Sequence, residues 1–309
     1  MIGCNETPAM LARARAEQPV IFPGPSGPLY GIITPAAPDS PVTGRCVVFP
    51  GRPRFRSRRL PVLWARILAA DGFTCLRFDI RGHGESAGSF GSGSRKKSTG
   101  FGGEDVIAAI HHMQDTRGES RFIVFGNCYD ANAALEAVKI DRGAIDGIVF
   151  AGGPVLSEKL GLPGFEQPSW TEKGRKAILS LLGRPGISNR TDFSKNFESA
   201  FGALLQSRVR ALFIYCDDDR FRREFKVAED RLFAKLDNDA RQRLQVEIVP
   251  GPSSAIDSGE PRLFERAVSW IREISDADGP PRPKSKLRKH GAQVALAPRR
   301  RNKPWPRPL

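Results

Sequence analysis

Cys128 is the side chain best placed to do chemistry in this sequence, because it stands where a strand pattern meets a helix pattern. Residues 121–125 (RFIVF) form a β-branched and aromatic run typical of a buried strand, and residues 130–138 have the alanine, leucine and glutamate content of a helix. Gly126 permits a tight turn between them. A side chain at such a corner sits at the top of a sheet, where the free amides of the following helix face a developing oxyanion. The pattern predicts a nucleophilic thiol; the plain alternative is a small buried apolar side chain.

The elements around Cys128 alternate between strand and helix patterns. This alternation predicts an α/β fold with a mostly parallel sheet and helices on both of its faces. Short helical pieces broken by glycine and proline at 154–206 predict a small helical cap. The domain is expected to span 20–275, between an N-terminal extension at 1–19 and a basic, proline-rich, disordered tail at 276–309. Strands are expected at 20–34 (two strands and a turn), 46–51, 73–80, 121–125, 147–153, 211–216 and 246–250, and helices at 60–70, 104–113, 130–138 and 263–274.

Two motifs in this order carry a resemblance to a known superfamily. FDIRGHGESAG at 78–88 is similar to the D-x-R-G-x-G-x-S turn of the α/β-hydrolases, and GNCYDANAAL at 126–135 is similar to their nucleophile elbow and the helix after it. More narrowly, the chain resembles bacterial hydrolases whose elbow reads G-x-C-x-G-A, including serine-aminopeptidase-like and exosortase-associated proteins. The resemblance covers roughly 20–275 and implies an α/β-hydrolase fold acting on a small acyl-containing substrate.

The resemblance also implies a nucleophile and an oxyanion hole. The nucleophile of the family falls on Cys128 without any shift. The oxyanion amides fall on the backbone near Gly51 and Arg52, after the third strand, and on Tyr129, directly after the nucleophile. Asp79 and Arg81 of the first motif are expected to shape a turn through local hydrogen bonds.

The acid and the base of the catalytic triad are less well matched. The acid falls on Asp219, three residues after Cys216, which replaces the glycine of the family; Asp217 and Asp218 stay open as alternatives. The base is absent, because the loop PGPSSAID places Ser254 where the family has histidine. A serine hydroxyl cannot act as a base at neutral pH.

None of the four histidines replaces that base in the sequence pattern. His111 and His112 stand late on the helix before the Cys128 strand, so we expect them near the opposite end of the sheet. His83 belongs to the turn after the fourth strand, which is not expected to neighbour the strand of Cys128. His290 lies in the basic tail.

A thiol retains some reactivity without a base, because its reference pKa is about 8.5 and a helix N-terminus lowers it. The carboxylate of Asp130, at the position of a family glycine, opposes that effect by favouring the neutral thiol. Hydrolysis of an acylated Cys128 still needs a base. We therefore expect an ester or thioester hydrolase or acyltransferase with impaired turnover. The alternative is a catalytically degenerate member that acts by binding a ligand or partner.

Composition bounds the remaining possibilities. Residues 279–309 contain ten lysines and arginines and no acid, so the other 278 residues hold only about +4 of the net charge of +14. Such a tail either binds an anionic partner through its summed charge or stays a solvated extension, so the charge does not indicate a nucleic-acid-binding domain.

The cysteines and the apolar runs bound the location of the chain. An odd number of cysteines without framework spacing predicts reduced thiols and a cytoplasmic location, and Cys46, Cys75 and Cys216 are expected in the core. No apolar run has the length of a membrane span or the character of a signal peptide. His and Cys do not cluster at metal-ligand spacing and no phosphate loop is present, so we expect no metal and no cofactor.

Overall fold

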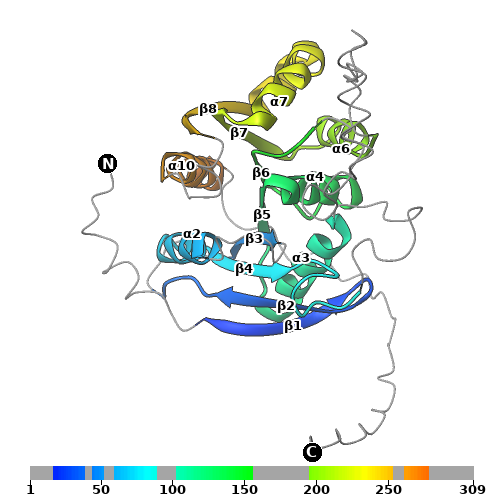
Figure 1. Cartoon of the computed structure of the whole chain (residues 1–309). Coiled ribbons are helices and arrows are strands. Elements are labelled where there is room, and N and C mark those ends of the chain that lie inside the picture. The colour runs from blue at the N-terminus through cyan, green and yellow to red at the C-terminus, as the bar shows by residue number, and fades with distance from the viewer. Residues whose placement is uncertain are drawn as a thin grey trace, which may run out of the picture.

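The computed structural model describes residues 17–38, 44–51, 59–88, 102–155, 195–252 and 261–277. One eight-stranded sheet, in the order β1-β2-β4-β3-β5-β6-β7-β8, runs through this part of the chain (Figure 1). Strands β3 to β8 are parallel, whereas β1 and β2 form an antiparallel hairpin and β2 is antiparallel to β4. The predicted α/β fold with a mostly parallel sheet is confirmed. The strands are β1 (Gln18–Gly24), β2 (Gly27–Thr34), β3 (Arg45–Gly51), β4 (Thr74–Asp79), β5 (Arg121–Asn127), β6 (Gly147–Ala151), β7 (Arg210–Asp218) and β8 (Leu244–Pro252).

Helices cover both faces of the sheet, as Figure 1 shows. On one face, α2 and α10 pack together through stacked rings of Trp64 and Phe264, whose centroids are 5.0 Å apart. The other face holds α3, α4 and α6. The two cores divide β5 residue by residue, with Phe122 facing α3 and α4 and Phe125 facing α2 and α10. The helices are α2 (Arg59–Ala70), α3 (Gly103–Arg117), η1 (Cys128–Asp130), α4 (Ala131–Ile140), α6 (Lys195–Leu205), α7 (Arg220–Arg231), η2 (Phe233–Lys235), α8 (Asn238–Arg243) and α10 (Pro261–Ala277).

The structure differs from the sequence expectation around β7 and β8. Strand β7 continues to Asp218, and a bulge interrupts its pairing with β8 between Cys216 and Asp218. Helices α7 and α8, which were not predicted from the sequence, follow it. Of the expected cap at 154–206, residues 156–194 lie outside the described residues. In the part after them, Phe197 of α6 packs on the sheet with its ring 6.2 Å from that of Phe150.

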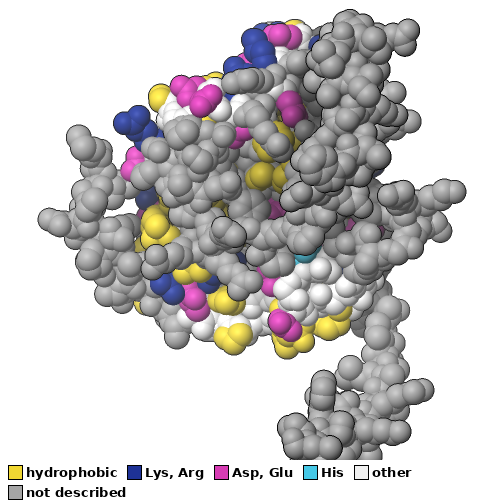
Figure 2. Space-filling view, in the orientation of Figure 1, with side chains coloured by type: hydrophobic (Ala, Val, Ile, Leu, Met, Phe, Trp, Pro, Cys, Tyr) yellow, Lys and Arg dark blue, Asp and Glu magenta, His cyan; other side chains and the backbone are white. Residues whose placement is uncertain are grey.

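One edge of the sheet is formed by β1, which pairs with β2 in a hairpin. Ile21 and Ile32 are 60% and 37% exposed there, and Figure 2 shows hydrophobic side chains along the lower rim of the molecule, where Figure 1 places these strands. Pro19 and Pro23 of β1 have no backbone N–H, which is typical of edge strands protected from pairing with another strand. Among the described residues, no helix is long and apolar enough to cross a bilayer.

Candidate active site

The backbone of Cys128 is strained. Among the residues that the structure describes, Cys128 is the one non-glycine residue with a positive φ, at 53°. It lies between Asn127, the extended last residue of β5, and the turn η1 that leads into α4. A left-handed L-residue costs roughly 1–2 kcal/mol and persists where the surrounding structure imposes it. Here the positive φ of Cys128 ends the extended conformation of β5 and leads the chain into η1.

Gly126 explains why the turn can be so tight. A Cβ atom on Gly126 would lie 2.5 Å from Cα of Ala131 and 2.7 Å from the carbonyl oxygen of Asp130. The first turn of α4 therefore rests directly on the β5 backbone. Asp130 is 1% exposed and precedes the first residue of α4.

The strand order places Cys128 where the connections of the sheet reverse direction. The chain passes from β3 to β4 on one side of the sheet, whereas from β5 it proceeds through β6, β7 and β8 on the other. Pairing between β3 and β5 ends at Val48 and Val124, so Gly51 and Asn127 extend beyond it. Open α/β sheets bind ligands at the carboxyl ends of strands at such a point.

The predicted oxyanion residues lie at the end of β3 and in the turn after β5. Gly51 ends β3 and its carbonyl accepts a hydrogen bond of 3.1 Å from the Ile80 N–H, so the end of β3 is anchored to the turn after β4. Tyr129 directly follows Cys128 in η1. Arg52 lies outside the described residues.

The end of β7 lies beside the turn that contains Cys128. The rings of Tyr129 and Phe221 meet edge to face with centroids 5.7 Å apart. Phe221 is two residues after Asp219, and its backbone N–H donates a 2.7 Å hydrogen bond to Oδ1 of Asp219. Asp219 is 3% exposed and stands directly before α7, so its carboxylate caps the N-terminus of that helix.

The three aspartates at the end of β7 and directly after it, Asp217 to Asp219, differ in burial and in partners. Asp217 and Asp218 are exposed, whereas Asp219 is buried. Oδ1 of Asp217 accepts a 2.8 Å hydrogen bond from the Gly251 N–H at the end of β8. This bond connects the ends of β7 and β8; Ser254, two residues after the end of β8, lies outside the described residues.

The described histidines do not lie on β5 or on the strands beside it. His83 lies in the turn after β4, and β3 separates β4 from β5. The ring of His112 stacks on Phe22 of β1 at 5.0 Å, and burial lowers its pKa. Strand β1 is four strand spacings from β5, or about 19 Å at about 4.8 Å each. His111 is exposed, and His290 lies outside the described residues.

Comparison with known families identifies this arrangement. The profile of the family described as Serine aminopeptidase, S33 matches residues 41–198, about half of the chain. The chain belongs to this family of α/β-hydrolases. No curated protein matches the sequence.

Solved structures support the fold of this α/β-hydrolase. The esterase Pf2001 from Pyrococcus furiosus is 16% identical with a TM-score of 0.58, over 87% of this chain and 95% of its own. XC6422 from Xanthomonas campestris, an α/β serine hydrolase without a lid, is 16% identical with a TM-score of 0.51, over 86% and 97%. The α/β-hydrolase GrgF from Penicillium sp. sh18 is 15% identical with a TM-score of 0.54, over 85% and 100%. At these identities the likeness establishes the fold.

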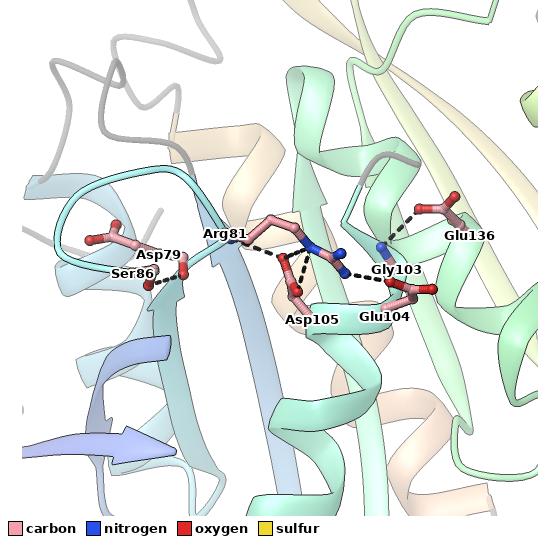
Figure 3. A network of polar contacts seen from close by, with 7 residues as sticks. All are labelled: Asp79, Arg81, Ser86, Gly103, Glu104, Asp105 and Glu136. Carbon is pink, nitrogen blue, oxygen red and sulfur yellow. Dashed lines mark hydrogen bonds and ion pairs between the residues drawn. The ribbon is translucent and has the colours of Figure 1, made fainter. Parts of the chain in front are cut away.

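The first motif of this α/β-hydrolase forms a turn, as expected, but the side-chain hydrogen bonds of Arg81 are not the local ones that were predicted, because they reach Glu104 and Asp105 of α3. Arg81 donates from Nε to both carboxylate oxygens of Asp105, at 2.9 and 3.1 Å, and from its backbone N–H at 2.9 Å (Figure 3). Its guanidinium also meets Glu104 at 2.7 Å. Burial lowers the pKa of Arg81. The hydrogen bonds to these two carboxylates raise it by a larger amount, so its net pKa lies above the ordinary value. On the other side of the turn, Ser86 donates to the carbonyl of Asp79 at 2.5 Å.

The same network reaches the helix that follows Cys128. The backbone N–H of Gly103, the first residue of α3, donates a 2.8 Å hydrogen bond to Glu136 of α4 (Figure 3). Helix α3 therefore connects the turn after β4 with α4. The sequence did not predict the contacts of Asp105 with Arg81 or of Glu136 with Gly103, because each contact joins two separate elements of the fold.

The other described cysteines pack in the core as expected. Cys46, Cys75 and Cys216 are at most 1% exposed. Burial raises the pKa of the Cys46 and Cys75 thiols well above the ordinary value. Cys128 is half-buried, so it is the most exposed of the described cysteines.

Proposed function

We propose that this α/β-hydrolase transfers acyl groups from a small ester or thioester through a covalent intermediate on Cys128, as a hydrolase or acyltransferase with slow turnover. The observation that carries this proposal is the left-handed backbone of Cys128 at the carboxyl end of β5. A buried structural cysteine needs no such strain, whereas a nucleophile at a strand-to-helix corner does.

The neighbouring residues have defined roles in the proposal. The Cys128 sulfur attacks the acyl carbon, and the amides of Tyr129 and of the Gly51–Arg52 segment stabilise the oxyanion. A single donor of this kind is typically worth about 10²–10³-fold in rate. Acyl transfer to a thiol needs neither metal nor cofactor.

Deacylation is the slow step in this scheme. Asp219 occupies the place of the triad acid, but Ser254 occupies that of the histidine. General-base assistance to water is typically worth about 10²–10⁴-fold, and this chain lacks it at that position. We expect a rapid first acylation followed by slow release.

The first experiment is a burst assay with p-nitrophenyl acetate, followed by intact mass and peptide mapping. A Cys4→Ser background removes the one cysteine outside the described residues. We expect about one equivalent of p-nitrophenol and an acetyl group on Cys128, both absent in Cys128→Ala. A chain with neither burst nor mass increase acts through binding instead, which is the degenerate alternative.

The second experiment restores the missing base. Ser254→His should raise steady-state turnover by at least about 10-fold if its loop reaches the acyl group. The double variant Ser254→His with Asp219→Asn should lose most of that gain, since a triad imidazole is oriented by its acid. An unchanged rate in Ser254→His would contradict the assignment of that position.

A further inference from the structure

We propose that Asp105 of α3 is a positioning residue for acyl transfer. By holding the chain just after β4, it sets the direction of the backbone N–H that follows Gly51 in the oxyanion hole. This inference rests on the proposed function and names a residue that controls it from a distance. Asp105 is fully buried and belongs to a helix separate from the turn of Cys128, so it acts through other residues.

Asp105 holds both the side chain and the backbone of Arg81. Its Oδ2 accepts a 2.9 Å hydrogen bond from the Arg81 backbone N–H, and both of its oxygens accept from Nε of Arg81 (Figure 3). Hydrogen bonds to a carboxylate are stronger than neutral ones, and burial strengthens them because water does not compete. The bond to the backbone N–H fixes the chain itself, which a bond to the guanidinium alone would not do.

Ile80, directly before Arg81, connects this fixed point to β3. The carbonyl of Ile80 accepts a 3.1 Å hydrogen bond from the His83 N–H, and the Ile80 N–H donates a 3.1 Å hydrogen bond to the Gly51 carbonyl. Ile80 is fully buried in the core on the α3 side of the sheet. The peptide groups on both sides of Ile80 are therefore held, and one of them holds the end of β3.

The direction of the Gly51 carbonyl decides where the next N–H points. A trans peptide group is planar, so its C=O and its N–H point in opposite directions. Strand β3 lies between β4 and β5, and the Gly51 carbonyl faces the β4 side, where it meets Ile80. The N–H of the same peptide group therefore faces the β5 side.

This N–H stands at the level of the nucleophile. Strands β3 and β5 are parallel, with Val48 paired to Val124. The same offset places Gly51 level with Asn127, the last residue of β5, and the peptide group after Gly51 level with Cys128. The described pairing of the two strands ends at Val48 and Val124, so this N–H lies beyond the ladder and is oriented to meet an oxyanion.

An oxyanion donor depends on its direction. When the Cys128 sulfur bonds to the acyl carbon, the carbonyl π bond breaks and its electron pair moves onto the oxygen, which the donor must then face. Loss of one such donor typically costs about 10²–10³-fold in rate. Release of the Arg81 backbone would misdirect the donor rather than remove it, so we expect a loss of at least about 10-fold.

The test compares two reactions of Cys128, of which only one forms an oxyanion. Acetylation by p-nitrophenyl acetate passes through an oxyanion, whereas alkylation by iodoacetamide displaces iodide from a CH₂ carbon and forms none. A displaced thiol would slow both reactions. In a Cys4→Ser background, Asp105→Ala should slow acetylation of Cys128 at least about 10-fold and alkylation less than about 2-fold, both followed by peptide mapping.

Three variants separate the backbone bond from charge and from stability. Asp105→Asn retains an oxygen that can accept from the Arg81 N–H, so its acetylation should stay within about 3-fold of wild type. Glu104→Gln changes a contact that reaches the guanidinium of Arg81 only, and should leave both rates unchanged. Asp237→Ala removes the N-cap of α8, far along the chain from this network, and should lower stability without changing either rate. If Asp105→Ala does not fold, Asp105→Ser, whose side chain is too short to hold the Arg81 N–H, replaces it.

The outcomes distinguish this inference from the proposed function. If wild-type Cys128 is not acetylated, the proposed function fails and the role of Asp105 fails with it. If wild type is acetylated but Asp105→Ala keeps its acetylation rate, or slows equally in acetylation and alkylation, acyl transfer stands and the positioning role is refuted. Equal loss of acetylation in Asp105→Ala and Asp105→Asn would also refute it, because the charge and not the backbone bond would then control the rate.

Discussion

Replacing Gly126 by alanine tests whether close contact between β5 and α4 holds Cys128 in its strained position. The added methyl group would lie 2.5 Å from Cα of Ala131, 2.7 Å from the carbonyl oxygen of Asp130 and 2.9 Å from the Ala131 nitrogen. All three are backbone atoms and cannot rotate away. Because carbon atoms normally rest about 3.5–4.0 Å apart, β5 or α4 must move by about 1 Å.

Two effects of that displacement have predictable sizes. Overpacking of this kind costs typically about 1–3 kcal/mol of unfolding free energy. With a urea dependence of about 3 kcal/mol/M, the unfolding midpoint should fall by about 0.3–1 M. A displacement of about 1 Å at the nucleophile can cost about 10²-fold in rate, so the acylation burst of Cys128 should slow by about that factor.

The matched control is Gly202→Ala in α6. A Cβ at Gly202 would meet nothing within 4 Å, so the same substitution there should stabilise the helix by about 0.5–1 kcal/mol and leave acylation unchanged. Urea unfolding followed by tryptophan fluorescence and the p-nitrophenyl acetate burst measure both effects. If Gly126→Ala retains wild-type stability and burst rate, contact with α4 does not hold the turn.

Three further predictions address other parts of the chain. Burial raises the pKa of Glu17, but hydrogen bonds and charges from Arg66 and Arg77 outweigh it and leave that pKa below its ordinary value. The resulting stabilisation is present above the unfolded-state pKa of about 4.3 and is lost as the pH falls through the lower folded-state pKa, so Glu17→Gln should lower Tm at pH 7 but match wild type well below pH 4. Asp219→Ala, which removes the cap of α7, should cost about 1 kcal/mol in urea unfolding, whereas Asp219→Asn keeps a capping oxygen and should cost much less; equal losses would mean that the charge stabilises the fold. Truncation after Asp278 removes ten basic residues and should abolish any salt-sensitive binding of RNA or anionic vesicles measured by fluorescence anisotropy or co-sedimentation, while persistence of binding would place the anion site in the folded domain.

Much of the fold could be predicted from local sequence, because the information was local. The apolar runs of β3, β5 and β6 are buried along their length and were readable as strands of a parallel sheet. The corner at Cys128 was likewise readable, since Gly126, the strand before it and the helix after it are contiguous. Helices α7 and α8 were not predicted, although Phe221 and Phe225 of the strongly charged α7 stand four residues apart, the spacing of an amphipathic helix.

Sequence by itself determined which chemical groups this protein possesses, among them a thiol at a strand-to-helix corner and three successive aspartates. Tertiary structure alone decided how deeply those groups are buried and what they contact. Asp219 is buried as the cap of α7, while Asp217, two residues earlier, faces solvent and holds Gly251. Burial, strand order and backbone strain arise from contacts between segments far apart in the chain, and no local pattern of residue types encodes them.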